Sequence, residues 1–209
     1  RARQGCMANS GTAGYFGGGQ YQETVYTTID KYSFPGDSRS TLGTGLSVAR
    51  AVLAAMANSG VAGYFAGGSD NSTPDRTTVD KLAFPGDTRT TLGTGLSVAK
   101  RGITGMANSG VTGYFVGGYG NTTGDSVQLE KFAFPSDTRS ISSSSLSVAG
   151  RDSTAMANSG VAGYVANGGY PMVATVDKFE FPSDTRTTLG TGLSSSRYAM
   201  GGMADGGAI

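Results

Sequence analysis

The side chains that could perform chemistry in this sequence are carboxylates, tyrosines and hydroxyls, because the chain contains no histidine and one cysteine. Without histidine there is no Ser-His-Asp triad, no Cys-His dyad and no imidazole ligand for a metal ion. A single cysteine forms neither an intrachain disulfide nor a thiolate metal cluster, and we expect Cys6 to be a buried, inert thiol. The sequence therefore predicts no catalytic residue, no metal site and no cofactor.

The residues best placed to bind a partner lie in polar segments that follow Gly-Gly pairs and differ from one another along the chain. Tyrosine rings there could stack on sugars or on a partner protein, and carboxylates and amides could supply hydrogen bonds. The alternative is that these loops vary because nothing constrains them. The predicted binding residues are Tyr21, Glu23, Asp70, Asn71, Asp75, Tyr119, Asn121, Asp125 and Tyr170.

The same loops carry two weaker signals. Asp70, Asn71 and Asp75 offer oxygen ligands for calcium, as do Asn121 and Asp125, but their spacing matches no defined calcium loop. Asn71 and Asn121 each begin an N-glycosylation sequon, which matters only if the source glycosylates secreted proteins.

Charge and hydrophobicity argue against two classes of partner. The formal net charge is +1, so nothing favours binding of the whole chain to nucleic acid or to an anionic membrane. No apolar run approaches the roughly 20 residues of a membrane helix. We therefore expect neither a nucleic-acid partner nor membrane insertion.

An internal repeat of about 50 residues organises the chain. The pentapeptide Met-Ala-Asn-Ser-Gly begins at Met7, Met56, Met106 and Met156, and a Phe-Pro pair followed by aspartate recurs in step with it. We therefore expect one repeat domain over 1–209. Its units span about 1–49, 50–99, 100–149 and 150–196, and 197–209 begins a fifth repeat or supplies a closing strand.

Turn residues divide each repeat into four short strands. In the second repeat we expect strands at 52–57, 61–66, 77–84 and 88–92, separated by Asn-Ser-Gly, by Gly-Gly with its variable loop, and by Pro-Gly-Asp. One four-stranded sheet per repeat predicts an all-β propeller, or a segment of one, with antiparallel blades. Aromatic residues should form the core between blades. The Asp and Arg that follow each Phe-Pro should cap turns and form ion pairs, worth about 0–1 kcal/mol each where exposed.

These blades resemble kelch repeats. The resemblance rests on the basic residue Arg50, the strand 54–58, the aromatic strand ending in Gly-Gly at 63–68, and the third strand at 79–84. It covers essentially the whole chain, but the usual fourth-strand tryptophan is absent and the third-strand tyrosine survives only as Tyr32. The recurring wording around Phe-Pro-Ser/Gly-Asp-Thr-Arg also resembles kelch-like arrays in structural and fibre proteins of tailed phages, especially aquatic ones.

Three functions follow as expectations. The first is a non-catalytic extracellular structural or assembly protein, such as a virion appendage or surface filament component, whose partners are its own copies or other structural subunits. One support is that an innermost strand is expected in 1–8 and again in 197–204, whereas a ring of four blades needs only one of these two strands. The second is a propeller that binds a cell-surface glycan or receptor through the loops after Gly-Gly. The third, a remote one, is a carboxylate-dependent glycan-active enzyme. Some kelch propellers are oxidases of the galactose-oxidase kind, but that resemblance implies copper-binding histidines, and this chain has no histidine.

Overall fold

The protein is described from a computed structural model over residues 1–70, 75–169, 172–197 and 200. Within these residues the chain contains strands and turns but no helix, which confirms the predicted all-β class. Accordingly, the described residues include no helix long and apolar enough to cross a membrane. The predicted residues Asn71 and Tyr170 lie outside the described ranges, as does most of the predicted fifth repeat.

Sixteen of the strands form four antiparallel sheets, one for each repeat, and each sheet keeps sequence order from the inner to the outer strand. Blade 1 contains β1 (Gly5–Asn9), β2 (Ala13–Gly17), β5 (Ile29–Ser33) and β6 (Arg39–Thr41). Blade 2 contains β7 (Ala54–Asn58), β8 (Ala62–Ala66), β9 (Val79–Ala83) and β10 (Thr88–Thr91). Blade 3 contains β11 (Thr104–Asn108), β12 (Thr112–Val116), β15 (Gln128–Ala133) and β16 (Thr138–Ser145). Blade 4 contains β17 (Thr154–Asn158), β18 (Ala162–Ala166), β19 (Val176–Glu180) and β20 (Thr185–Thr188).

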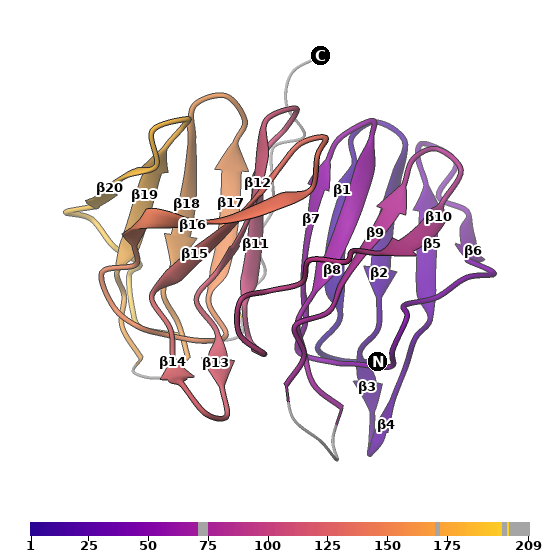
Figure 1. Ribbon diagram of the computed structural model, residues 1–209, viewed down its shortest axis with the longest axis horizontal. Helices are drawn as coiled ribbons and strands as arrows, with labels where there is room; N and C mark the ends of the chain where they lie inside the picture. The colour runs from indigo at the N-terminus through magenta and orange to yellow at the C-terminus, as the bar shows by residue number, and fades with distance from the viewer. Residues whose placement is uncertain (71–74, 170–171, 198–199, 201–209) are drawn as a thin grey trace.

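Two small hairpins extend from the loops after Gly-Gly. They are β3 (Gln20–Tyr21) with β4 (Thr24–Val25), and β13 (Tyr119–Gly120) with β14 (Gly124–Asp125). Both lie at one end of the blades, labelled at the bottom of Figure 1. The variable loops of different repeats therefore share one rim of the molecule, which we call the loop rim.

The Gly-Gly pairs are required by close backbone contacts, the first glycine with the following repeat and the second with its own. Gly67 and Gly68 both adopt positive φ, +63° and +91°. A Cβ atom at Gly67 would lie 2.7 Å from the Lys100 carbonyl oxygen, and one at Gly68 would lie 2.6 Å from that of Ala51. Glycine is therefore the residue that fits where the second strand leaves the sheet.

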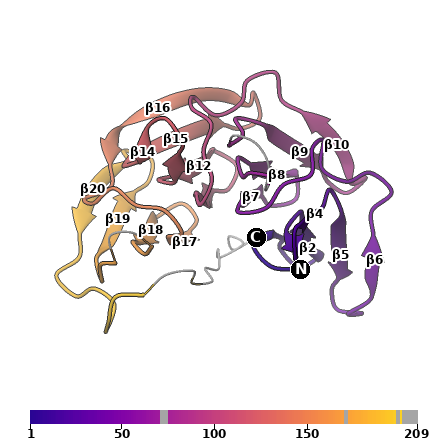
Figure 2. The ribbon, with the colours of Figure 1, turned by 90° about the horizontal axis from the view of Figure 1, so that it is seen from below.

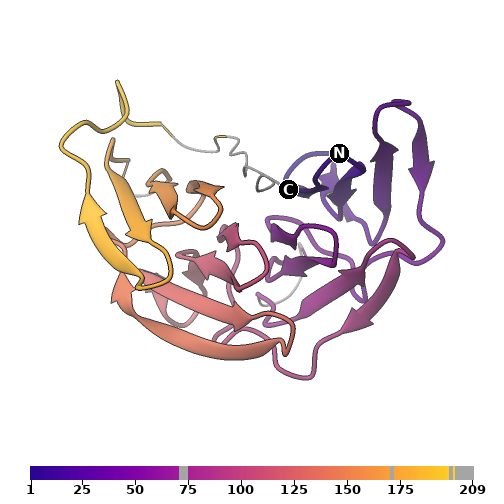
Figure 3. The same cartoon turned by 90° about the horizontal axis from the view of Figure 1, so that it is seen from above.

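The blades are arranged around an axis as in a β-propeller, with β1, β7, β11 and β17 innermost and β6, β10, β16 and β20 at the periphery (Figure 3). Each innermost strand contacts that of the next blade, and three apolar clusters fill the spaces between blades 1 and 2, 2 and 3, and 3 and 4. Figures 2 and 3 show that the described parts of blades 1 and 4 do not meet, so the four blades form an open arc.

The prediction for Cys6 is wrong, because its side chain is exposed. At the same position in blade 3, a Cβ atom at Gly105 would lie 2.2 Å from the Ala55 carbonyl oxygen of blade 2. This position therefore faces the preceding blade. Blade 1 has no preceding blade among the described residues, so Cys6 faces outward.

Candidate functional site

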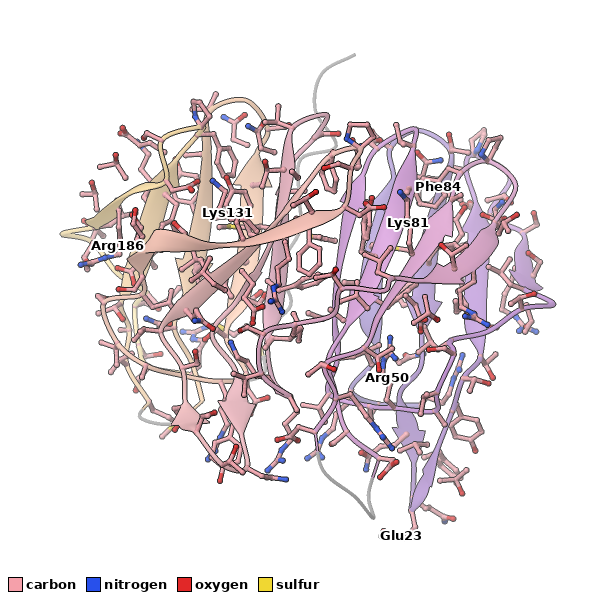
Figure 4. The ribbon with its side chains drawn as sticks, viewed as in Figure 1. Glu23, Arg50, Lys81, Phe84, Lys131 and Arg186 are labelled. Atoms are coloured by element: carbon pink, nitrogen blue, oxygen red, sulfur yellow. The ribbon has the colours of Figure 1, made fainter. Side chains whose placement is uncertain are left out.

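Neighbouring blades are joined by a repeated set of contacts, in which a tyrosine and a lysine of one blade bind an aspartate of the next. Between blades 2 and 3, the Tyr64 hydroxyl donates to Asp137 Oδ1 at 2.7 Å, and Lys81 Nζ donates to Asp137 Oδ2 at 2.6 Å. The Tyr64 ring stacks on Phe134 with 5.4 Å between ring centroids. The equivalent residues are Tyr15, Lys31, Asp87 and Phe84 between blades 1 and 2, and Tyr114, Lys131, Asp184 and Phe181 between blades 3 and 4. Figure 4 labels Lys81, Phe84 and Lys131 in the half of the blades farther from the loop rim.

A methionine from each of the first three blades fills the space left by a glycine in the next. A Cβ atom at Gly113 would lie 2.3 Å from Met56 Sδ and 2.9 Å from Phe134 Cζ. The other pairs are Met7 with Gly63 and Met106 with Gly163. A larger residue at the glycine would displace the methionine from the core.

Each blade therefore has two different faces, which we name by their hydrogen bonds. The donor face carries the methionine, tyrosine and lysine, as Met56, Tyr64 and Lys81 do in blade 2. The acceptor face carries the glycine, phenylalanine and aspartate, as Gly113, Phe134 and Asp137 do in blade 3. Within the chain, each donor face packs on the acceptor face of the following blade.

The environment keeps the interface tyrosines protonated. Burial raises the pKa of Tyr15, Tyr64 and Tyr114, and the hydrogen bond to aspartate and the charge of that aspartate raise it further. A neutral phenol is required for the donated hydrogen bond. The aspartate therefore holds two donors, one neutral and one cationic, from the preceding blade.

A second inter-blade contact is centred on the carboxylate of the third strand. Asp80 of blade 2 accepts hydrogen bonds from the Ser47 amide at 2.9 Å and the Ser47 hydroxyl at 3.0 Å, across the boundary with blade 1. It also pairs at 3.0 Å with Arg50, whose side chain is fully buried. Burial lowers the pKa of Arg50, and the negative charge of Asp80 opposes that shift. Blade 3 repeats the pattern with Ser97, Lys100 and Glu130, and blade 4 with Ser147 and Asp177.

In blade 1 only half of this second contact is present. Asp30, the equivalent of Asp80, bonds to Arg1, Arg39 and Thr41, all of its own blade. Its side chain is 18% exposed, against 1% for Asp80. Among the described residues, no serine of a preceding blade bonds to Asp30.

The acceptor face of blade 1 is accessible to solvent. Phe16, Tyr32 and Phe34 on this face are 36%, 38% and 44% exposed. The Phe16 and Tyr32 rings meet edge to face at 5.7 Å, the same arrangement as Phe115 and Phe132 in the buried acceptor face of blade 3. An open hollow of about 550 Å³ lies over this face, lined by Arg1, Gln4, Gly14, Phe16, Asp30, Tyr32, Phe34 and Asp37.

The donor face of blade 4 is accessible as well. Met156 is 51% exposed, whereas its counterparts in the other blades are at most 9% exposed. Tyr164 and Lys178 accompany it on β18 and β19. Lys178 pairs with Glu180 of its own strand instead of with an aspartate of another blade. The two ends of the arc thus present one donor face and one acceptor face.

On the loop rim, the structure brings some of the predicted binding residues together through arginines. Asp75, which is almost fully buried, accepts from Arg101 Nη1 at 2.6 Å and from the Asn121 amide at 3.0 Å. Arg101 also donates to Asn121 Oδ1 at 2.9 Å. These contacts connect the loop of blade 2 with that of blade 3, so Asp75 and Asn121 serve to join blades.

Tyr119 and Asp125 lie beside the same cluster. The guanidinium groups of Arg101 and Arg151 lie over the Tyr119 ring, 4.7 and 4.5 Å from its centroid, within the range of a cation–π contact. Arg151 also pairs with Asp125 at 3.5 Å. A sugar that stacked on this ring would have to displace a guanidinium group.

The other predicted loop residues lie apart from this cluster. Asp70 pairs with Arg76 at 2.5 Å on blade 2. Tyr21 is 61% exposed on the β3–β4 hairpin, and Glu23 lies at the tip of that hairpin (Figure 4). Of the predicted set, Tyr21 thus has the most accessible described ring.

The prediction from sequence did not identify which polar residues join neighbouring blades. It treated the aspartates after Phe-Pro as turn caps and local ion pairs, although Asp87, Asp137 and Asp184 bind the tyrosine and lysine of another blade. The recurrence of Tyr, Lys and Asp at fixed positions in every repeat was the available signal. It also missed Arg101 and Arg151, which share one position of the repeat that holds alanine in the first two repeats.

The aspartates of the loop rim are held in ion pairs. No cluster of three or more His, Cys, Asp or Glu residues that could hold a metal ion occurs among the described residues. The loop aspartates Asp70, Asp75 and Asp125 are each paired with an arginine. The accessible surfaces at the two ends of the arc are the acceptor face of blade 1 and the donor face of blade 4, and both combine apolar and hydrogen-bonding groups.

The fold and these faces define a β-propeller of four blades. No protein-family model matches the chain, and no curated protein matches its sequence. The class of the protein therefore rests on its own repeat and on the geometry of its blades.

Proposed function

We propose that this protein is a non-catalytic structural protein that assembles through the end blades of its arc. The observation that carries the proposal is the exposed acceptor face of blade 1, where Phe16, Tyr32 and Phe34 remain more than a third exposed. Aromatic side chains grouped around a hollow are typical of surfaces that bind another protein. At the positions of Phe16 and Tyr32, the internal acceptor faces carry Phe65 and Leu82, Phe115 and Phe132, and Val165 and Phe179, all of which are buried.

The proposal extends to the kind of particle. A kelch-like repeat, few charged residues and a surface rich in Gly, Ser and Thr suit a component of a virion appendage or surface filament located outside the cell. Its partners are then further copies or other structural subunits of the same particle.

The test is the mass of the purified protein as a function of concentration, by light scattering, with negative-stain imaging of the same samples. We expect particles larger than the 21.1 kDa of a single chain, and their size should increase with protein concentration. A single 21.1 kDa species at every concentration would contradict the proposal.

A second function, binding of a cell-surface glycan or receptor, is favoured by one observation. Tyr21 combines high exposure with a position on a two-stranded hairpin that projects from the loop rim. A glycan array should then give a saturable signal that Tyr21→Ala removes and Val161→Asp, at the opposite end of the blades, leaves unchanged. The absence of any glycan signal for the wild-type protein would rule out a glycan ligand.

A further inference from the structure

The two end faces of the arc are complementary to each other. The Met–Gly, Tyr–Phe and Tyr/Lys–Asp contacts of the internal interfaces each have one half on blade 4 and the other half on blade 1. Blade 4 offers Met156, Tyr164 and Lys178, the donor-face set. Blade 1 offers Gly14, Phe34 and Asp37, the acceptor-face set, and Asp37 has a φ of 48°, close to the 53–60° of its three interface counterparts.

We propose that the donor face of blade 4 binds the acceptor face of blade 1 of a second copy, in the register that joins blades within the chain. This inference rests on the proposed assembly function and specifies its interface. Tyr164 and Lys178 of one copy would donate to Asp37 of the other, as Tyr114 and Lys131 donate to Asp184. The Tyr164 ring would stack on Phe34, as Tyr114 stacks on Phe181.

The inner strands support the same register. Asn108 Oδ1 of blade 3 accepts from the Gly160 amide of blade 4 at 2.8 Å, and the two preceding blade pairs repeat this bond. At the ends of the arc, Asn158 of one copy is the matching acceptor and the Gly11 amide of the other is the matching donor. Gly11 has the positive φ, 67°, of its counterparts, so its amide is already oriented.

Charge also favours this pairing over pairing of like faces. Lys178 is the cation of the donor face, and Asp37 is the anion of the acceptor face. Two acceptor faces would offer no Lys178 to Asp37, and two donor faces would offer no Asp37 to Tyr164 and Lys178, so neither like pair reproduces the charged contact.

A contact between two different faces is heterologous, so it leads to a ring or to an open fibre. Two copies supply eight blades, which is the upper end of the usual range for a closed propeller. If the rotation between copies does not close the ring after two, the assembly keeps one free donor face and one free acceptor face after each addition and can grow further.

The experiment blocks one face at a time. Gly14→Trp places a bulky ring where Met156 would be seated, and Met156→Asp brings a charge into the same apolar contact. Each substitution lies on a surface that is exposed in the single chain, so each variant should keep the circular dichroism spectrum of the wild type. Each variant alone should be monomeric, with the dissociation constant for assembly raised by about 100-fold or more.

A mixture of the two variants gives the decisive result. The Gly14→Trp chain keeps an intact blade 4, and the Met156→Asp chain keeps an intact blade 1. Mixed in equal amounts, they should form a pair of twice the 21.1 kDa chain mass that grows no further. An interface between like faces would not give this result.

A matched control is available on the same blade. Val161 is 54% exposed, and its counterparts Val61 and Val111 are 48% and 49% exposed although their blades have neighbours. This position therefore lies outside the interface, and Val161→Asp should assemble as the wild type does.

The outcomes separate this inference from the proposed function. Assembly of the wild type that persists in both blocked variants would overturn the inference and leave the assembly function standing. A wild-type protein that is monomeric at every concentration would overturn both. Monomeric single variants that form a pair on mixing are the expected result.

Discussion

Phe134 of blade 3 and Phe34 of blade 1 occupy the same position of the repeat, yet one is 9% exposed and the other 44%. Phe134 stacks on a tyrosine of the preceding blade, and Phe34 has no such partner among the described residues. The comparison shows that the environment of a repeat residue depends on the neighbouring blade as much as on its own strand. Internal and terminal faces therefore provide matched positions that differ only in the presence of that neighbour.

The largest difference is expected for a bulky residue at the acceptor-face glycine. Gly113→Trp should lower the free energy of unfolding by at least about 3 kcal/mol, because the new side chain overlaps Met56 and Phe134. Gly14→Trp should change it by no more than about 0.5 kcal/mol, because the nearest atom to a Cβ there is Phe34 Cζ of the same blade, at 3.4 Å. Urea unfolding followed by circular dichroism, at a concentration where the protein is monomeric, measures both. Equal destabilisation of the two variants would show that blade 1 is not a free end.

A smaller difference is expected for the aspartate of the acceptor face. Asp137→Ala should cost about 2–3 kcal/mol, because it removes hydrogen bonds from Tyr64 and Lys81. Asp37→Ala should lower the free energy of unfolding by only a small fraction of that amount. The two positions have φ values of 57° and 48°, so the backbone penalty for alanine is similar in both and cancels in the comparison. Thermal and urea unfolding of the two variants side by side give this difference, and similar losses for both would mean that the bonds to Asp137 contribute little.

The smallest effect concerns pH and sharpens the same comparison. The pKa of Tyr64 is raised in the folded chain by burial, by its hydrogen bond to Asp137 and by that charge, whereas an unfolded tyrosine ionises near pH 10. The folded chain therefore retains a proton that the unfolded chain releases, so stability is full below about pH 10 and falls as the pH rises above it. Unfolding free energies of wild type and Tyr64→Phe between pH 8 and 11 should show a shallower fall in the variant. Parallel curves would contradict the role assigned to the buried phenol.

Much of the fold was predictable because it is encoded locally. Asn-Ser-Gly turns, Gly-Gly pairs and Phe-Pro-Ser/Gly-Asp turns punctuate each repeat, and the predicted strands of blade 2 differ from the observed ones by at most two residues at every end. The strand β9 is the shortest relative to expectation, since it begins two residues later than predicted, at Val79, and ends one residue earlier, before the turn at Phe84. Short strands bounded by turn residues need little tertiary information.

The candidate site was predictable only in part, because its residues act across blade boundaries. Lys31 and Asp87 are 56 residues apart in sequence, and Tyr15 and Asp87 are 72 apart. Loop composition identified Asp75 and Tyr119 as polar and aromatic residues on a rim. It did not show that Arg101 of blade 3 binds Asp75 and lies over the Tyr119 ring.

The sequence by itself determined the repeat, the four strands of each blade, the faces along which apolar residues alternate and the absence of histidine chemistry. The tertiary structure decided which copy of each repeated residue is buried. Met56 and Met156 have the same local sequence, but among the described residues only Met56 has a following blade that supplies a glycine to receive it. The physical reason is that strand and turn formation depend on neighbouring residues in the chain, whereas burial, pKa and binding surface depend on which blade is stacked against each face.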